Sequence, residues 1–406
     1  MRVAFVSQWF PPENGAIVPW NIATGLAQLG HDVDVLTAFP NYPSGVIKDG
    51  WKQRPYSRER ILPNVTVHRS PVYPSHDANP VRRMATYLSH AVSASAMSAN
   101  RVPRPDVWLI YSSPATAALP AQLARPGRRA PTCLLIQDLW PDSVSGSDMV
   151  DGVAARLTHR GLTTYTNASY RQAARIGVIS PGMTQVLTDR GVPGKKIEWT
   201  PNWMPDETAP VMVARSTLRL PEQGRLFLYA GNLGGLQGLD GLVDAFEKVP
   251  EATLVLMGDG IERKGLERRA ARIPNVHVLP AVDQSSVAEY LAAADVLVVS
   301  LKDTALLRVT MPSKMQVSLR AGRPVLVHAA GDAAELVLAA GAGAAAAPGD
   351  AAATNAAISR LTTATNSQLA AMGTAARTCY EKNFTPEVGA RRLETMLVNA
   401  QKDGRP

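Results

Sequence analysis

The sequence predicts an α/β protein made of two doubly wound, parallel-sheet domains. Short apolar runs of strand length alternate with helical patterns along the chain, as in βαβ units. Thr200–Pro210 is rich in proline and polar residues and interrupts this alternation, which then starts afresh. The length of 406 residues is sufficient for two or three domains, each with its own core.

The N-terminal half opens with a βαβ unit. We expect a strand at Arg2–Ser7, a helix at about Ile17–Leu29 and a second strand at Val33–Thr37. The loop Trp9–Ala16 carries the single Gly15 instead of the G-x-G-x-x-G fingerprint, so an oxidoreductase is disfavoured. Further strands are expected at four apolar runs, Val65–His68, Val107–Tyr111, Thr132–Ile136 and Ile176–Ile179.

The C-terminal half repeats the pattern. Strands are expected at Leu226–Ala230, Thr253–Met257, Val276–Leu279, Val296–Ser300 and Pro324–Val327. Helices are expected near Leu239–Lys248, Ile261–Ile273, Ser285–Ala293, Pro312–Ala321, Ser367–Lys382 and Pro386–Gln401. The alanine-rich segment Ala339–Ala357 contains three glycines and a proline, so we expect a loop and a helix start there.

The basic charge of the chain is confined to one half. Met1–Pro205 contains 21 Lys and Arg against 13 Asp and Glu, whereas Asp206–Pro406 contains 21 of each. A positive N-terminal domain suits an anionic partner such as a phospholipid surface or a lipid pyrophosphate. No basic run is interleaved with aromatic residues, so a nucleic-acid partner is not expected.

Cysteine usage and hydropathy favour a cytoplasmic protein. Cys133 and Cys379 lie far apart in apolar segments, which fits a reducing compartment and no zinc site. No apolar run approaches the roughly 18 residues of a membrane span. Any contact with the inner face of the plasma membrane is therefore expected to be peripheral. One candidate is the helix expected near Pro80–Asn100, where Arg82 and Arg83 precede an apolar stripe, although such a stripe can equally face the core.

Three motifs of the C-terminal half suit a phosphate. The strand ending at Ala230 is followed by G-N-L-G-G-L-Q-G, and the next strand by Gly258-Asp259-Gly260. Glycines in such turns let backbone N–H groups approach a phosphate closely. The segment Pro312-Ser313-Lys314 reads as a helix start, where free N–H groups and a partial positive charge also favour an anion.

The ordered set of motifs resembles the retaining glycosyltransferases of family 4. The C-terminal half carries G-N-L-G-x-x-Q-G-L-D, G-D-G, A-A-D-V-L-V-V-S, P-S-K-x-Q and A-G-R-P-V-L. The N-terminal half carries V-S-Q-W-F-P-P-E-N, L-G-H-D-V-D-V-L-T, P-N-Y-P-S-G and Q-D-L-W-P-D-S, which are similar to the colanic acid and L-fucosamine-type transferases of bacterial polysaccharide assembly.

This resemblance implies a GT-B fold, with two Rossmann-like domains facing a central cleft. It implies an acceptor-binding domain at residues 1–205 and a nucleotide-sugar-binding domain at 206–385. A last helix within 386–406 is expected to cross back to the first domain. It also implies transfer with retention of the anomeric configuration, without a protein nucleophile.

Several family positions are altered. Asn232 and Gln237 stand where many members carry Arg and Lys to neutralise the donor diphosphate. Val309 and Val317 stand where the wider family has its Glu-x7-Glu pair, although the compared branch also tends to lack this pair. Because a departing diphosphate develops negative charge, we expect Lys314 and Arg308 to stabilise it.

The remaining donor-site residues are expected to bind through hydrogen bonds and close backbone approach. They are Gly15, Gly231, Asn232, Leu233, Gln237, Gly258, Asp259, Pro312, Ser313 and Gln316. The sequence has no Asp-x-Asp motif of metal-dependent transferases, so neither a metal nor another cofactor is expected.

The acceptor site is expected at the end of the strand Thr132–Ile136. Asp138 could orient or deprotonate the acceptor hydroxyl, or simply form a structural turn. Trp140 could stack on a sugar face, and Asp142 and Asn14 are further acceptor-binding candidates.

The sequence thus predicts a cytoplasmic glycosyltransferase that moves a sugar from a nucleoside-diphosphate sugar, with a UDP-sugar favoured, to a lipid-linked or glycan acceptor. Two alternatives stay open at this level: a nucleotide-sugar 2-epimerase of the same fold, and a non-catalytic nucleotide-sugar-binding protein.

Overall fold

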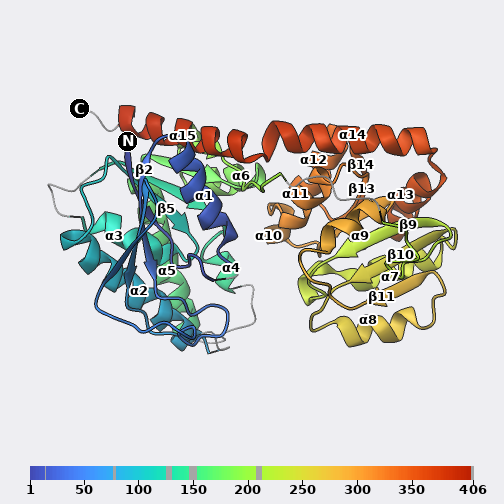
Figure 1. Cartoon of the computed structure of the whole chain (residues 1–406), viewed down its shortest axis with the longest axis horizontal. Helices are drawn as coiled ribbons and strands as arrows, with labels where there is room; N and C mark the ends of the chain where they lie inside the picture. The colour runs from blue at the N-terminus through green and yellow to red at the C-terminus, as the bar shows by residue number, and fades with distance from the viewer. Residues whose placement is uncertain (14, 76–78, 125–129, 146–152, 207–212, 404–406) are drawn as a thin grey trace. The chain divides into compact units, whose positions relative to one another are not determined.

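The computed structural model describes residues 1–13, 15–75, 79–124, 130–145, 153–206 and 213–403. The chain divides into two compact units (Figure 1). The N-terminal unit is Met1–Trp203 with Pro386–Pro406, and the C-terminal unit is Met204–Thr385. The division after Trp203 falls two residues before the expected one.

The N-terminal unit is built on an eight-stranded sheet in the order β3-β4-β2-β1-β5-β6-β7-β8. All neighbouring strands are parallel except β3 and β4. The strands are β1 (Arg2–Val6), β2 (Asp32–Ala38), β3 (Ser57–Leu62), β4 (Val65–Ser70), β5 (Val107–Ser112), β6 (Thr132–Ile136), β7 (Arg175–Val178) and β8 (Ile197–Trp199).

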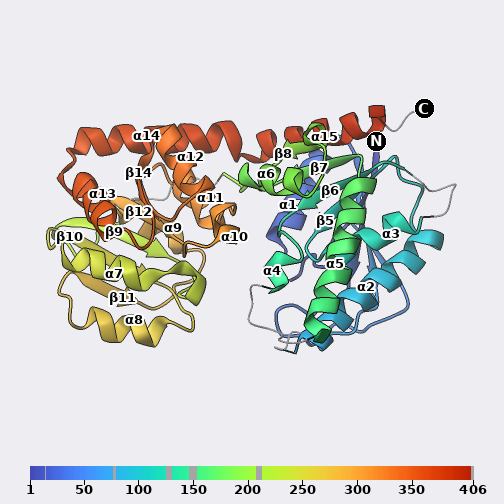
Figure 2. The ribbon, with the colours of Figure 1, turned by 180° about the vertical axis from the view of Figure 1, so that it is seen from behind.

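Helices cover both faces of this sheet. They are α1 (Ile17–Gln28), α2 (Pro80–Asn100), α3 (Leu119–Gln122), α4 (Asp142–Ser145), α5 (Val153–Gln172), α6 (Gly182–Asp189) and α15 (Pro386–Asp403), with 3-10 turns η1 (Ala115–Ala118) and η3 (Gly194–Lys196). Apolar residues of α1 and α15 share one core with the sheet. From behind, α5, α2 and α3 lie over the opposite face (Figure 2).

The C-terminal segment belongs to the N-terminal unit because small residues let α15 pack closely on α1. A Cβ atom on Gly25 would lie 3.1 Å from the Cβ of Ala390. A side chain on Gly389 would collide with the ring of Trp203, which is 5% exposed. His31 Nε2 lies 2.9 Å from a carboxylate oxygen of Glu394. The sequence periodicity predicts the helix, and these contacts place it.

The C-terminal unit contains a six-stranded parallel sheet in the order β11-β10-β9-β12-β13-β14. Its strands are β9 (Arg225–Ala230), β10 (Ala252–Met257), β11 (Val276–Leu279), β12 (Val296–Ser300), β13 (Val325–His328) and β14 (Gly343–Ala346). Its helices are α7 (Leu239–Glu247), α8 (Arg263–Ala270), α9 (Val287–Ala293), α10 (Ala305–Arg308), α11 (Ser313–Arg320), α12 (Asp332–Ala340), α13 (Ala351–Thr363) and α14 (Asn366–Asn383), with the turn η4 (Gly235–Gln237).

Alternation along β9 shows how this sheet separates two cores. Phe227 and Tyr229 pack with α7, α8 and α13 on one face, while Leu226 and Leu228 pack with α9 on the other. A parallel sheet buried on both faces is the expected consequence of alternating strands and helices. The predicted fold class, α/β with two doubly wound domains, is confirmed.

Three short strands were not predicted. β3 is mostly exposed and polar and pairs antiparallel to β4 at the edge, and β8 has only three residues. The alanine-rich segment was expected to form only a loop and a helix start, and this is wrong for Gly343–Ala346, which form β14. Alanine has little intrinsic strand preference, so pairing with β13 decides this element.

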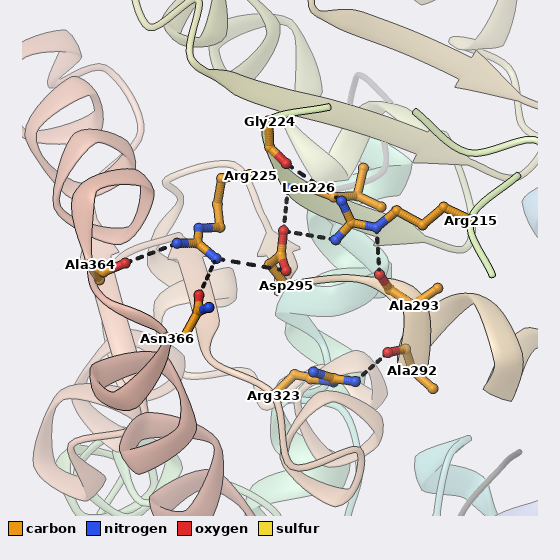
Figure 3. A network of polar contacts seen from close by, with 10 residues as sticks. All are labelled: Arg215, Gly224, Arg225, Leu226, Ala292, Ala293, Asp295, Arg323, Ala364 and Asn366. Atoms are coloured by element: carbon orange, nitrogen blue, oxygen red, sulfur yellow. Dashed lines mark hydrogen bonds and ion pairs between the residues drawn. The ribbon is translucent and has the colours of Figure 1, made fainter. Parts of the chain in front are cut away.

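A carboxylate ties together the amino ends of strands in the C-terminal unit (Figure 3). Asp295, just before β12, accepts a hydrogen bond from the backbone N–H of Leu226, 2.8 Å away. The guanidinium of Arg215 lies 2.8 Å from the same carboxylate, and that of Arg225 lies 3.8 Å away. Arg225 also donates to the carbonyl of Ala364 at 2.9 Å. Asp295 and Arg225 together therefore join β9, β12 and the segment before α14.

We expect Asp295→Ala to lower the free energy of unfolding by about 3 kcal/mol, because two largely buried guanidinium groups would lose their carboxylate. Urea unfolding would measure the change. Glu222→Ala, at an exposed position in the same unit, should stay within about 0.5 kcal/mol of wild type. Equal stability of the two variants would show that the network contributes little.

Candidate active site

Two glycine-containing loops interlock at the carboxyl ends of β9 and β10. The N–H of Gly231 donates to the carbonyl of Met257 at 2.9 Å, and that of Leu233 donates to Asp259 at 2.8 Å. The carbonyl of Leu233 accepts from the N–H of Glu262 at 2.9 Å. The predicted donor-site residues Gly231, Leu233 and Asp259 are therefore held together by backbone hydrogen bonds.

Gly258 is required sterically where the loops cross. Its φ of 155° lies in the region that favours glycine. A Cβ atom at this position would overlap the carbonyl oxygen of Gly231. The absence of a side chain therefore allows the two loops to touch.

We expect Gly258→Ala to lower the free energy of unfolding by about 2–3 kcal/mol, because it combines backbone strain with overpacking. Nucleotide affinity should fall as well, since the loops must separate. Urea unfolding and UDP titration would measure both effects. Gly265→Ala is the matched control, because position 265 lies inside α8, where an added Cβ would meet only a side-chain oxygen of Glu262, 4.0 Å away. That variant should keep wild-type nucleotide affinity.

Lys314 lies on the first turn of α11, against the glycine loop. A Cβ on Gly231 would be 2.5 Å from its Cε atom. Its Nζ lies 5.2 Å from the ring centroid of Tyr229, whose hydroxyl donates to the carbonyl of Asn232 at 2.7 Å. Burial lowers the pKa of Lys314. In the described ranges of the chain, no carboxylate forms an ion pair with it. A partly desolvated cation beside a glycine loop is poised for an anionic ligand.

The other predicted donor-site residues differ in accessibility. Asn232 and Asp259 are exposed, and Asp259 accepts a hydrogen bond from the N–H of Gly260 at 2.8 Å. The Gln237 side chain accepts from the N–H of Gly234 at 3.1 Å, which shapes the loop. Ser313 is exposed at the start of α11, and Pro312 is its N-cap, so the helix begins one position after the expected start. Gln316 is 3% exposed and faces the interior.

Arg308 is engaged by a neighbouring acid. Its Nε and one terminal nitrogen lie 2.5 and 2.8 Å from the two carboxylate oxygens of Asp303. This pair holds the pKa of Asp303 below its usual range. The sequence suggested Arg308 as a cation for the diphosphate, but the structure shows its charge already paired. Lys314 is the stronger candidate.

A buried pair links the strand ends behind the glycine loop. The hydroxyl of Ser300, at the end of β12, donates to the carbonyl of Gln237 at 2.7 Å. Its oxygen also lies 3.0 Å from Nδ1 of His328, at the end of β13. Burial lowers the pKa of His328 to about 4, so this imidazole is neutral near pH 7.

This pKa predicts acid sensitivity. The unfolded chain binds a proton at His328 below about pH 6.5, whereas the folded chain does so only near pH 4. The stabilisation is therefore complete above pH 6.5 and is lost as the pH falls toward 4. Between pH 7.5 and 5, we expect His328→Gln to lose about 2 kcal/mol less unfolding free energy than wild type. Urea unfolding at both pH values would test this, and an unchanged difference would contradict it.

In the N-terminal unit, the loop after β1 is held by a buried acid. Glu13 accepts hydrogen bonds from the N–H groups of Phe10, Asn41 and Tyr42 at 3.1, 2.8 and 2.9 Å. A Cβ on Gly15 would lie 2.8 Å from Cε1 of Tyr42, so Gly15 makes room for that ring. The predicted acceptor residue Asn14 lies outside the described residues.

Asp138 lies exposed at the carboxyl end of β6. Its carboxylate accepts a hydrogen bond from the hydroxyl of Ser113, after β5, at 2.7 Å. This contact orients the carboxylate and leaves it accessible to solvent. The geometry suits a residue that accepts a hydrogen bond or a proton from a bound hydroxyl.

Trp140 and Asp142, expected to bind the acceptor, make contacts with other residues of the N-terminal unit. Trp140 is 5% exposed and packs edge-on to Tyr87, with centroids 5.7 Å apart, so it has no open face for a sugar. Its carbonyl accepts a hydrogen bond from Arg190 at 2.8 Å. Asp142 forms an ion pair with the same arginine. Both predicted acceptor residues therefore help to shape the loop that carries Asp138.

Comparison with known proteins identifies both halves of the chain. Residues 16–203 match the model of the glycosyl transferase 4-like domain, and residues 224–364 match that of glycosyl transferases group 1. The chain belongs to the family 4 glycosyltransferases. Both descriptions are of transferases, so the transferase interpretation is confirmed over the epimerase alternative.

Two relatives of this family 4 transferase are themselves named as glycosyltransferases. It is 26% identical over 334 residues to the putative colanic acid biosynthesis glycosyl transferase WcaI of Escherichia coli K12, covering 78% of each chain. It is 28% identical over 246 residues to the probable glycosyltransferase WbjE of Pseudomonas aeruginosa, covering 56% of this chain and 58% of that one.

Solved structures with the same fold include sucrose-phosphate synthase from Thermosynechococcus elongatus, with a TM-score of 0.72, 20% identity and 97% coverage of both chains. Anabaena Alr3699/HepE, determined in complex with UDP, has a TM-score of 0.70 and 16% identity, covering 98% of this chain and 100% of that one. The predicted GT-B fold of the family 4 transferase is confirmed.

Four residues that support the candidate site were not singled out from the sequence: Ser113, Arg190, Tyr229 and Ser300. Tyr229 lies two positions before the glycine loop motif, so its position was available as a signal. Ser113 and Arg190 contact the Asp138 loop from 25 and 50 residues away, and no local pattern reveals such contacts. Within the described segments, no group of three His, Cys, Asp or Glu side chains could hold a metal ion.

Proposed function

We propose that the protein is a retaining glycosyltransferase that takes its sugar from a UDP-sugar bound at the glycine loops of the C-terminal unit. The observation that carries this proposal is the partly buried Lys314 beside Gly231, with which no carboxylate of the described residues forms an ion pair. The diphosphate would lie against Lys314, with the hydroxyl of Ser313 and the first N–H groups of α11 as further donors. HepE, a protein of the same fold, was determined in complex with UDP, which supports a uridine donor.

In the reaction, the bond between the anomeric carbon and the UDP oxygen breaks, and a bond to the acceptor oxygen forms. The leaving diphosphate gains negative charge, which Lys314 would stabilise more strongly in the transition state than in the ground state. The acceptor hydroxyl loses its proton, for which Asp138 is the candidate base. Attack from the face that the diphosphate leaves would retain the anomeric configuration.

The acceptor is a lipid-linked or glycan molecule that enters the N-terminal unit. The charge excess of this half supports an acceptor that carries a pyrophosphate, because a basic surface attracts polyanions. The similarity to the putative colanic acid transferase WcaI supports a role in cell-surface polysaccharide assembly.

Peripheral contact with the inner face of the plasma membrane is part of the proposal. Val81, Leu88 and Val92 are 75%, 47% and 60% exposed, and their spacing of seven and four residues aligns them along one strip of α2. Arg82 and Arg83 adjoin this strip, and α2 contains no acidic residue. An apolar strip with adjacent arginines suits an anionic lipid surface. Among the described residues, no helix is long and apolar enough to cross a bilayer.

Vesicle sedimentation tests this contact. The protein should sediment with phosphatidylglycerol vesicles but not with phosphatidylcholine vesicles, and Leu88→Ser with Val92→Ser should weaken binding about tenfold. Equal binding of the double variant, or equal binding to neutral vesicles, would contradict the membrane proposal.

A thermal-shift series tests the donor proposal. A ligand that binds only the folded state stabilises it by about 2.7 kcal/mol at 100 times its Kd, so UDP should raise the melting temperature. GDP and dTDP at the same concentration should raise it less. Incubation of the protein with UDP-sugars and a panel of acceptors should then release UDP and form a glycoside. UDP binding without transfer to any acceptor would favour a non-catalytic binding protein.

A further inference from the structure

Four aromatic side chains from separate segments form a row in the N-terminal unit. Tyr42 follows β2, Trp9 follows β1, Tyr87 lies on α2 and Trp140 follows β6. Successive ring centroids are 5.5, 6.4 and 5.7 Å apart, with interplanar angles of 52°, 83° and 70°. We call these residues the aromatic row.

The row changes from buried to accessible along its length. Trp140 is 5% exposed and anchors the inner end. Trp9, Tyr42 and Tyr87 are only partly buried, so part of each residue is accessible to solvent. Partly exposed Trp and Tyr rings commonly present an apolar surface beside polar groups, which suits amphipathic ligands.

The loop after β1 holds Tyr42 at the outer end. Glu13 fixes its backbone N–H at 2.9 Å and that of Asn41 at 2.8 Å. Gly15 leaves the space that the Tyr42 ring occupies. A buried acid and a sterically required glycine therefore position a side chain that remains partly open to solvent.

Polar groups lie at the inner end. Trp140 is joined to Asp138 by a hydrogen bond from its N–H to the Asp138 carbonyl, 3.0 Å long. The Asp138 carboxylate is exposed and is oriented by the hydroxyl of Ser113. The row therefore combines aromatic surface with a carboxylate and a hydroxyl.

We propose that the aromatic row is the subsite for the acceptor's sugar ring. The C–H face of a pyranose would lie on the exposed parts of Trp9, Tyr42 and Tyr87, with a ring hydroxyl directed to Asp138. A sugar matches this arrangement better than an isoprenoid chain does, because the chain would displace water from the exposed Asp138 carboxylate without offering it a hydrogen bond. The proposal rests on the proposed transferase function. It specifies a sugar as the part of the acceptor that binds beside Asp138.

Saturation-transfer NMR with the full-length protein tests this subsite. The probes are the methyl glycosides of glucose, galactose, fucose and N-acetylglucosamine, with farnesyl phosphate as the lipid probe. Irradiation of aromatic protons should transfer saturation to the ring protons of at least one glycoside. Tyr42→Ala and Trp9→Leu should weaken that glycoside's binding about tenfold. Tyr42→Phe should retain binding, and so should Tyr73→Ala, which alters an exposed tyrosine outside the row.

Circular dichroism of each variant shows whether the variant is folded, so that a weaker saturation-transfer signal caused by unfolding is not mistaken for weaker binding. If Tyr42→Ala is unfolded, the other two variants test the subsite. Trp9→Leu should weaken glycoside binding about tenfold, whereas Tyr42→Phe should retain it. The subsite is refuted if no glycoside receives saturation, if both truncations leave the signal unchanged, or if farnesyl phosphate alone responds. The shift in melting temperature caused by UDP, measured on the same samples, tests the donor proposal separately. The two results are independent, because glycoside binding does not require nucleotide.

Discussion

Lys314→Ala should lower kcat/KM for the UDP-sugar about 100- to 1,000-fold, the usual effect of removing one group that stabilises developing negative charge. The physical reason is the position of this cation, beside Gly231 and the ring of Tyr229 and without a carboxylate in ion-pair contact among the described residues. Steady-state kinetics with a matched donor and acceptor would measure the loss.

Two variants control this experiment. Lys248→Ala removes an exposed lysine in the same unit and should leave kcat/KM unchanged. Lys314→Arg keeps the charge but not the shape of the group, so its activity should lie between that of wild type and Lys314→Ala. Wild-type turnover by Lys314→Ala would refute the assignment of this lysine to the donor diphosphate.

Asp138→Asn should lower kcat about 100- to 10,000-fold, the range expected when a general base is removed. The amide keeps the size of the carboxylate and can still accept the hydrogen bond of Ser113, but it cannot take a proton. Rapid-quench or steady-state measurement at saturating donor and acceptor would report kcat directly.

The accompanying measurements distinguish catalysis from structure. UDP affinity should stay at the wild-type value, because Asp138 lies in the N-terminal unit, whereas the nucleotide is assigned to the C-terminal unit. Asp49→Asn, at an exposed position of the N-terminal unit, should retain full kcat. If Asp138→Asn has normal kcat, the base is another group, such as an oxygen of the departing diphosphate.

The features that were predicted correctly from the sequence are encoded by residues close together in the chain. The strands β9 and β10 and the glycines that follow them were predicted, because apolar runs and turn residues are encoded within a few positions. Lys314 was found in the same way, from its place at a helix start. These features require no knowledge of distant neighbours.

Features that depend on distant contacts could not be predicted. Arg308 carries the right charge, but Asp303 uses it in a bidentate pair. Trp140 has the right chemistry for a sugar, but Tyr87 and the loop cover it. Burial and pairing are properties of the packed structure, and they decide whether a suitable side chain is available to a ligand.

By itself, the sequence determined the fold class, the two-domain organisation and the glycine loops, because periodicity and turn chemistry are local properties of the chain. Only the tertiary structure decided that β14 forms, that Gly15 makes room for Tyr42, that Glu13 holds the backbone of Tyr42, and that Trp9 and Tyr87 complete the aromatic row. Each of these depends on groups brought together from separate segments, where strand pairing, steric fit and desolvation act across the fold.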